Sequence, residues 1–60
     1  MFIAYYRPKF ARKSIYLTAY GDSTMRIDAK QFETSNEALD ALREYLGDSY
    51  YECNPACCRA

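Results

Sequence analysis

Short runs of aromatic and β-branched residues follow one another through the first half of the chain, and such runs are typical of β-strands. The first run extends from Phe2 to Phe10, where Pro8 indicates a strand end or an edge strand. The second extends from Ile15 to Tyr20, and the third from Met25 to about Lys30. Between them, Gly21-Asp22-Ser23 has the composition of a turn. We therefore expect three antiparallel strands joined by short connections.

The spacing of apolar residues then changes and predicts an amphipathic α-helix between Thr34 and Gly47. Thr34 and Glu37 form a capping box, in which each side chain can accept a hydrogen bond from the backbone N–H of the other residue. Gly47 suits the left-handed conformation that commonly ends a helix. The apolar positions on one side of this helix are Ala38, Leu39, Leu42, Tyr45 and Leu46.

The C-terminal segment from Asp48 onward carries weaker signals. A short fourth strand at Tyr50 to Cys53 is one interpretation, and Pro55 would end it. We expect a single domain over residues 1–52, followed by a mobile, cysteine-containing tail over residues 53–60.

These elements predict a two-layer α+β fold. An antiparallel three-stranded sheet, with or without the fourth strand, packs on one α-helix in the order β-β-β-α(-β). Strand alternation assigns the sheet face that meets the helix. In the first strand, that face carries Phe2, Ala4 and Tyr6 in preference to Ile3 and Tyr5. The other predicted core positions are Ile15, Leu17, Ala19, Met25, Ile27 and Ala29 from the sheet, with Leu39, Leu42 and Leu46 from the helix.

The same alternation places basic and tyrosine side chains on the sheet face turned away from the helix, where Asp28 is the sole acid. Tyrosine and arginine are enriched at the centres of protein interfaces. Cations beside aromatic rings equally suit nucleic acid, and polar strand residues often do no more than face water. The candidate partner-binding residues are Tyr5, Arg7, Lys9, Tyr16, Tyr20, Arg26 and Lys30.

The formal net charge is zero, but the charges are divided unequally along the chain. Residues 1–30 contain six basic and two acidic residues, whereas residues 31–60 contain two basic and six acidic ones. Several of these acids lie on the polar side of the predicted helix. Any contact with phosphates would therefore be confined to the sheet side of the molecule.

The composition argues against an enzyme. The chain has no histidine, which removes the commonest general base and the usual catalytic triads. Its two glycines cannot form a glycine-rich phosphate-binding loop, and a two-layer fold of 60 residues offers little cleft. We expect neither a catalytic site nor a cofactor.

The three cysteines, Cys53, Cys57 and Cys58, lie close together at the end of the chain. Structural zinc takes four ligands, so we expect free thiols and no metal site. An intermolecular disulfide, or a metal site completed by Glu52 or a partner chain, is the alternative. The odd number of cysteines, the lack of a secretion signal and the lack of a long apolar run predict a cytoplasmic protein without membrane contact.

The step Phe32-x-Thr34-x-x-Glu37-Ala38, where the predicted sheet leads into the helix, resembles two groups of proteins. One is the three-stranded-sheet-plus-helix, arm-type DNA-binding domain of some phage integrases. The other is the class of very small phage proteins that disable host machinery, such as the RNA polymerase inhibitor of T7-like phages. The resemblance covers roughly residues 15–46. The neutral charge argues against the integrase likeness, and neither group supplies functional residues for this chain.

Together these features predict a small non-catalytic protein-binding module, an inhibitor or adaptor of a phage or other mobile element. It would occupy the surface of a host or cellular protein through the tyrosine- and arginine-rich sheet face or through an edge strand. The alternative is a nucleic-acid-binding domain that uses the same face. A homodimer formed through the sheet or an edge strand is a third interpretation.

Overall fold

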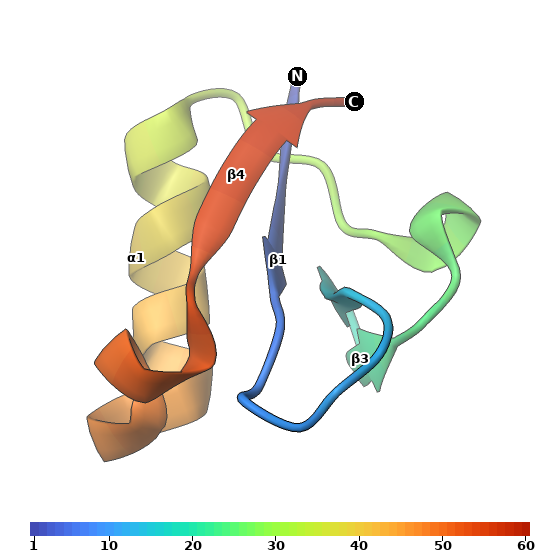
Figure 1. The fold of residues 1–60 in the computed structure, drawn as a ribbon. Coiled ribbons are helices and arrows are strands. Elements are labelled where there is room, and N and C mark those ends of the chain that lie inside the picture. Colours follow the sequence, from blue (N-terminus) through green and yellow to red (C-terminus); the bar gives the residue numbers. More distant parts are fainter.

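The computed structural model describes all 60 residues and contains four strands and one α-helix. The strands are β1 (Phe2–Tyr6), β2 (Ile15–Thr18), β3 (Gly21–Ser23) and β4 (Ala56–Arg59), and the helix is α1 (Ser35–Leu46). The strands form one antiparallel sheet in the order β3-β2-β1-β4, with α1 packed on one side of it (Figure 1). The predicted two-layer α+β class is confirmed.

A small core between sheet and helix holds the two layers together. Its buried members are Ala4 and Tyr6 of β1, Leu17 of β2, and Ala38 and Leu42 of α1. Ala38 and Leu42 are four residues apart, so they lie on the same side of the helix. The inward face predicted for the first strand is confirmed by this cluster. Further side chains pack around it, namely Phe2, Ile15, Phe32, Ala41, Leu46, Tyr50, Cys53 and Cys57.

The helix begins and ends where the sequence predicts. The Thr34 hydroxyl accepts a hydrogen bond from the Glu37 backbone N–H at 3.1 Å, which is one half of the expected capping box. Gly47 follows the last residue of α1 with a φ of 59°, and its N–H donates to the carbonyl of Arg43. A short 3-10 helix, η2 (Gly47–Ser49), continues from there. None of the helices combines the length and apolar character that a membrane crossing requires.

The third strand lies earlier in the chain than the sequence predicts. Gly21–Ser23, expected as a turn, is β3, and the turn consists of residues 19 and 20. The backbone N–H of Tyr20 donates to the Thr18 hydroxyl at 3.1 Å within that turn. Ala19 is consequently exposed and does not join the core.

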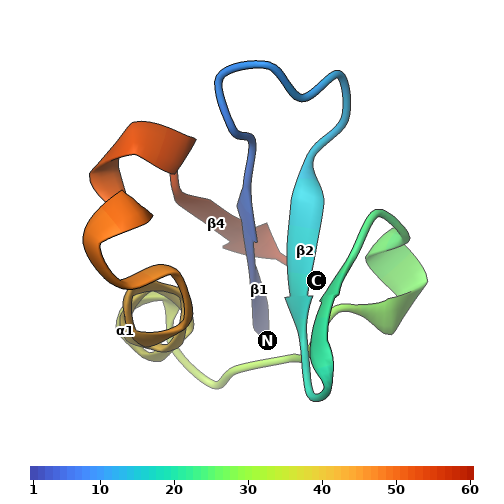
Figure 2. The same ribbon diagram turned by 90° about the horizontal axis from the view of Figure 1, so that it is seen from below.

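Residues 25–30, predicted as the third strand, form an irregular segment with a 3-10 helix, η1 (Arg26–Asp28). The Ser23 hydroxyl accepts a hydrogen bond from the Met25 backbone N–H at 3.0 Å. Such a local bond competes with strand pairing, so the chain turns away after Ser23. Met25 and Ile27 are therefore 59% and 88% exposed, instead of packing beneath the helix. Figure 2 shows η1 and α1 on opposite sides of the strands.

The fourth strand lies later in the chain than the sequence predicts. Residues 50–53 do not form a strand but end in the 3-10 helix η3 (Tyr51–Cys53). Asn54 then adopts a left-handed conformation, with a φ of 50°, and its side-chain amide donates to the carbonyl of the residue after β1 at 3.1 Å. This reversal brings Ala56–Arg59 alongside β1. The expected tail of residues 53–60 thus contains an edge strand of the sheet.

Candidate functional site

The sheet face turned away from α1 carries three of the seven predicted partner-binding residues. Tyr5 of β1 pairs with Tyr16 of β2, and their ring centroids are 5.8 Å apart at an interplanar angle of 47°. Because the neighbouring Ala4 and Leu17 point into the core, the two tyrosines point to the opposite face. Both are half-buried. Arg26 of η1 is the third residue on this face.

The guanidinium of Arg26 connects η1 with β4. Its Nη2 donates to the carbonyl oxygen of Arg59 at 2.8 Å, and its Nη1 donates to the Sγ of Cys58 at 3.7 Å. The bond with Cys58 is the main cause that raises the pKa of Arg26, and the hydroxyl of Tyr16 contributes in the same direction. Two hydrogen bonds thus join the guanidinium of Arg26 to β4.

The outer edge of β4 has no strand partner, because β4 pairs with β1 on one side only. Phe2 directs both its backbone N–H and its C=O to Phe32, at 2.7 Å each. Arg59 is the register partner of Phe2, so its own backbone groups point to the free edge. Since Arg26 already bonds one of these groups, part of the edge is blocked against a further strand.

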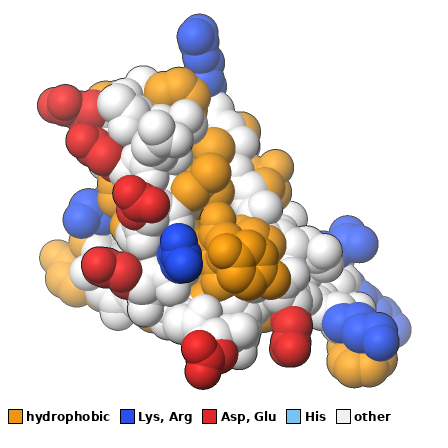
Figure 3. Space-filling view, turned by 90° about the vertical axis from the view of Figure 1, so that its left-hand side faces the viewer, with side chains coloured by type: hydrophobic (Ala, Val, Ile, Leu, Met, Phe, Trp, Pro, Cys, Tyr) orange, Lys and Arg blue, Asp and Glu red, His pale blue; other side chains and the backbone are white.

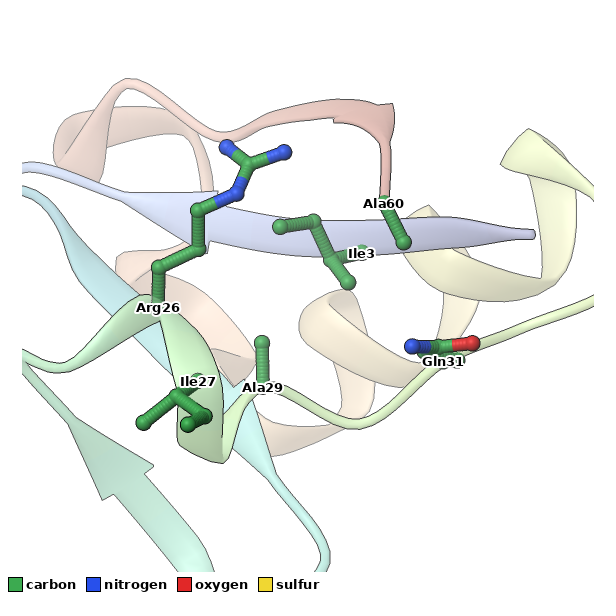
Figure 4. Close-up of a pocket in the computed structure, with 6 residues that line it drawn as sticks. All are labelled: Ile3, Arg26, Ile27, Ala29, Gln31 and Ala60. Atoms are coloured by element: carbon green, nitrogen blue, oxygen red, sulfur yellow. The ribbon is translucent and has the colours of Figure 1, made fainter.

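A pocket of about 360 Å³ opens between η1 and the ends of β1 and β4. Ile3, which is 2% exposed, contributes to it from β1, whereas Ile27 on η1 is 88% exposed. In Figure 4 the side chain of Arg26 extends from η1 toward β4 along one side of the pocket. The lining is mainly apolar and has one cation. It consists of Ile3, Arg26, Ile27, Ala29, Gln31 and Ala60.

The sequence predicts Ile27 in the core, because the alternation of residues 25–30 is that of a strand. The signal that indicates otherwise is the pair Ser23-Thr24 just before this segment. Short hydroxyl side chains bond nearby backbone N–H groups and favour turns. The sequence prefers Phe2, Ala4 and Tyr6 to Ile3 for the core face, and Ile3 is buried on the opposite face of the sheet.

Two predicted residues lie apart from the tyrosine pair. Tyr20 is fully exposed in the turn between β2 and β3. Lys30 donates its backbone N–H to the carbonyl of Leu17 at 2.9 Å, and its ammonium lies 5.3 Å from the centre of the Phe32 ring. Because Phe32 packs against the core, the Lys30 ammonium lies beside a ring at the margin of the core.

The remaining two predicted residues, Arg7 and Lys9, leave the sheet in the connection between β1 and β2. Residues 7–13, which we call the basic loop, have the sequence Arg-Pro-Lys-Phe-Ala-Arg-Lys, with four cations and no acid. Phe10 at its centre is 92% exposed, and the ammonium of Lys9 lies 5.8 Å from the centre of that ring. The seven residues predicted to share one surface are thus divided among the sheet face, the basic loop and the separate positions of Tyr20 and Lys30.

A carboxylate joins three elements on the helix side of the sheet. The Oδ2 of Asp22 accepts hydrogen bonds from the hydroxyls of Tyr6 at 2.9 Å and of Tyr45 at 3.0 Å. Burial of Tyr6, and then its bond to Asp22, raises the pKa of this phenol above its ordinary value of 10.0. The bond to Asp22 likewise raises the pKa of Tyr45. This cluster fastens β3 to β1 and α1.

The cysteines are divided between the two sides of the sheet. Cys57 pairs with Ala4 and packs against the core, as Cys53 does, whereas Cys58 is the hydrogen-bond partner of Arg26. All three thiols are free and half-buried. The structure brings together no group of three side chains that could hold a metal ion.

Comparison of the chain with protein families, with curated proteins and with solved structures found no match. Its function is therefore inferred from its own surfaces.

Proposed function

We propose that the protein is a small non-catalytic protein-binding module that contacts its partner through the face turned away from α1. It acts by occupying the partner's surface, as an inhibitor or adaptor. The observation that carries this proposal is the exposure of Ile27, which is 88% exposed beside a pocket with a mainly apolar lining. The exposed side chain extends the apolar surface of the pocket lining, and contiguous apolar surface of this kind is where another protein can bind.

The residues around the pocket also support a protein-binding site on this face. Tyrosine and arginine dominate the energetically important centres of protein interfaces, and this face carries Tyr5, Tyr16 and Arg26. The two rings contact each other, and Arg26 is fastened to β4. Side chains that are already ordered lose little conformational entropy on binding, so their contacts contribute more of their energy to affinity.

The chemistry of the pocket supports binding over catalysis. Arg26 is the only ionisable side chain in its lining, and the others are aliphatic or an amide. General acid–base catalysis needs a group that exchanges protons near neutral pH, and an arginine whose pKa is raised is unsuited to this role. A single fastened cation is also a weak basis for phosphate binding at this face.

The test is capture of a partner by the intact protein, carried out after nuclease treatment. A photoreactive amino acid at position 27 should cross-link one defined protein, and the purified partner should bind the wild-type chain. The variant Ile27→Ser should weaken that binding by more than tenfold, because it removes an apolar anchor. The matched control Phe10→Ser alters an equally exposed apolar residue in the basic loop and should leave the affinity unchanged.

Equal losses in Ile27→Ser and Phe10→Ser would contradict the assignment of the face. Full binding by a folded Ile27→Ser/Tyr16→Ala variant would contradict it as well.

A further inference from the structure

The basic loop is a feature that the proposed protein-binding face does not use. Its cations are Arg7, Lys9, Arg12 and Lys13, and all four side chains are exposed. Phe10 lies in their midst with 92% of its surface in solvent. A large apolar ring exposed to this degree contributes nothing to the core, and four like charges in seven residues repel one another. The loop therefore presents an apolar ring and a local positive potential to whatever approaches it.

The loop is nevertheless anchored to the body of the protein. The backbone N–H of Arg7 donates to the carbonyl of Cys53 at 2.8 Å, and the side-chain amide of Asn54 donates to the carbonyl of Arg7 at 3.1 Å. Within the loop, the N–H of Ala11 donates to the carbonyl of Pro8 at 2.9 Å. The cations and the ring are therefore presented on a defined turn rather than on a free chain.

We propose that the basic loop is a binding site for single-stranded nucleic acid. The four cations contact successive phosphates, and the ring of Phe10 stacks on a base. Aromatic side chains interleaved with cations are the usual means of holding a single strand without sequence preference, because every base offers a face for stacking. In a duplex these faces are covered by neighbouring bases, so an exposed ring would gain little there.

The distribution of charge fits a local contact of this kind. In Figure 3 the acidic side chains are spread over the face on which α1 lies, and basic side chains gather with an apolar one at the lower right. The acidic helix side repels phosphates, so a polyanion would contact the molecule away from α1, where the basic loop has four cations in seven residues. A lipid surface is the other large anion, but membrane binding scales with the apolar area inserted, and Phe10 is the only large apolar residue of the loop.

The experiment is a titration of the full chain against a fluorescent twelve-residue oligodeoxythymidine and the matching oligouridine, at several salt concentrations. Each phosphate contact on a single strand contributes about −0.7 to the slope of log K against log salt, so four contacts predict about −3. The variant Lys9→Ala/Lys13→Ala should flatten this slope by about 1.4. Phe10→Ala should weaken binding by about 5- to 150-fold, with the slope unchanged.

Matched controls distinguish an effect specific to the basic loop from an effect of net charge alone, and from an effect of the protein-binding face. Lys30→Ala removes a cation outside the loop, Tyr20→Ala removes an exposed ring outside it, and Ile27→Ser alters the pocket. All three should retain wild-type affinity for the oligonucleotides. Thermal unfolding of every variant checks that it is folded.

The proposal is overturned by undetectable binding at low salt, or by a Phe10→Ala variant that binds as tightly as wild type. It is also overturned if Lys30→Ala or Tyr20→Ala weakens binding as much as the loop variants do. Preference for a duplex of the same length, or binding to phosphatidylserine vesicles without binding to the oligonucleotides, would assign the loop to a different partner. The protein-binding proposal is tested by partner capture and not by oligonucleotide binding. It can therefore hold even if the basic loop binds no nucleic acid.

Discussion

Tyr6 and Tyr20 are chemically identical and both come from the strand-rich half of the chain, yet one is buried and the other is fully exposed. Tyr6 faces the core, and its hydroxyl donates to Asp22 at 2.9 Å, whereas Tyr20 occupies a turn. The inward direction of Tyr6 was predictable from strand alternation. Its hydrogen bond to Asp22 was not predictable, because the pairing of β3 with β2 is what places Asp22 near Tyr6.

The raised pKa of Tyr6 predicts that the free energy of unfolding decreases at alkaline pH. The folded-state pKa of Tyr6 is raised above the ordinary 10.0, so the native protein keeps this proton at pH values where the unfolded chain has lost it. The resulting stability is fully present below about pH 10 and is lost as pH rises above 10 toward the folded pKa. The free energy of unfolding, measured in urea from pH 7 to 12, should therefore fall more steeply in wild type than in Tyr6→Phe.

A tyrosinate absorbance titration gives an independent check. The pKa values of Tyr6 and Tyr45 are both raised, so part of the tyrosine absorbance should appear only well above pH 10, and this late fraction should shrink in Tyr6→Phe. The control Tyr45→Phe removes only the other hydroxyl on Asp22 and should leave the Tyr6 step in place. Parallel pH profiles for wild type and Tyr6→Phe would show that the Asp22 cluster does not couple stability to pH.

Among the elements, α1 lies where local sequence signals predict it, whereas β3 and β4 lie at other positions along the chain than predicted. Thr34 and Gly47 act on their own neighbours, so their capping roles follow from sequence. β4 depends on a reversal at Asn54 and on pairing with residues more than fifty positions earlier. The sequence of the cysteine-rich segment alone does not predict that pairing.

Removal of residues 55–60 tests the position of β4. The strand makes four residue pairs with β1, and each backbone hydrogen bond contributes about 1 kcal/mol. We expect the shortened chain to lose about 2–4 kcal/mol of unfolding free energy in urea denaturation, a large part of the stability of so small a domain. Removal of Ala60 alone is the control and should cost much less. An unchanged denaturation midpoint after removal of 55–60 would instead agree with a mobile tail.

For the whole molecule, the fold places two candidate surfaces on different parts of the chain. The sheet face contains the pocket beside Ile27, and the basic loop contains Phe10. No hydrogen bond links these two residues or their loops, so substitutions in one surface should not affect the other. The acidic side chains on the face of α1 repel polyanions from that side of the molecule.

The double variant Ile27→Ser/Phe10→Ala tests this independence. It should lose partner capture by the same factor as Ile27→Ser and oligonucleotide affinity by the same factor as Phe10→Ala, each within about 0.5 kcal/mol. Binding curves for both ligands with the two single variants provide the comparison. Losses that depend on both substitutions at once would mean that the two surfaces form one site.

The sequence by itself determined the class of the fold, the bounds of α1 and the inward face of β1, because capping and periodicity are local properties of the chain. It also determined which side chains are available for binding. Tertiary structure decided where they lie. The Ser23 hydroxyl turned residues 25–30 out of the sheet and exposed Ile27, and the pairing of β4 with β1 placed Cys58 and the Arg59 carbonyl within reach of Arg26. The predicted surface was divided for two reasons: the local bond at Ser23 outweighed the strand pattern of residues 25–30, and the pairs between β4 and β1 join residues more than fifty positions apart.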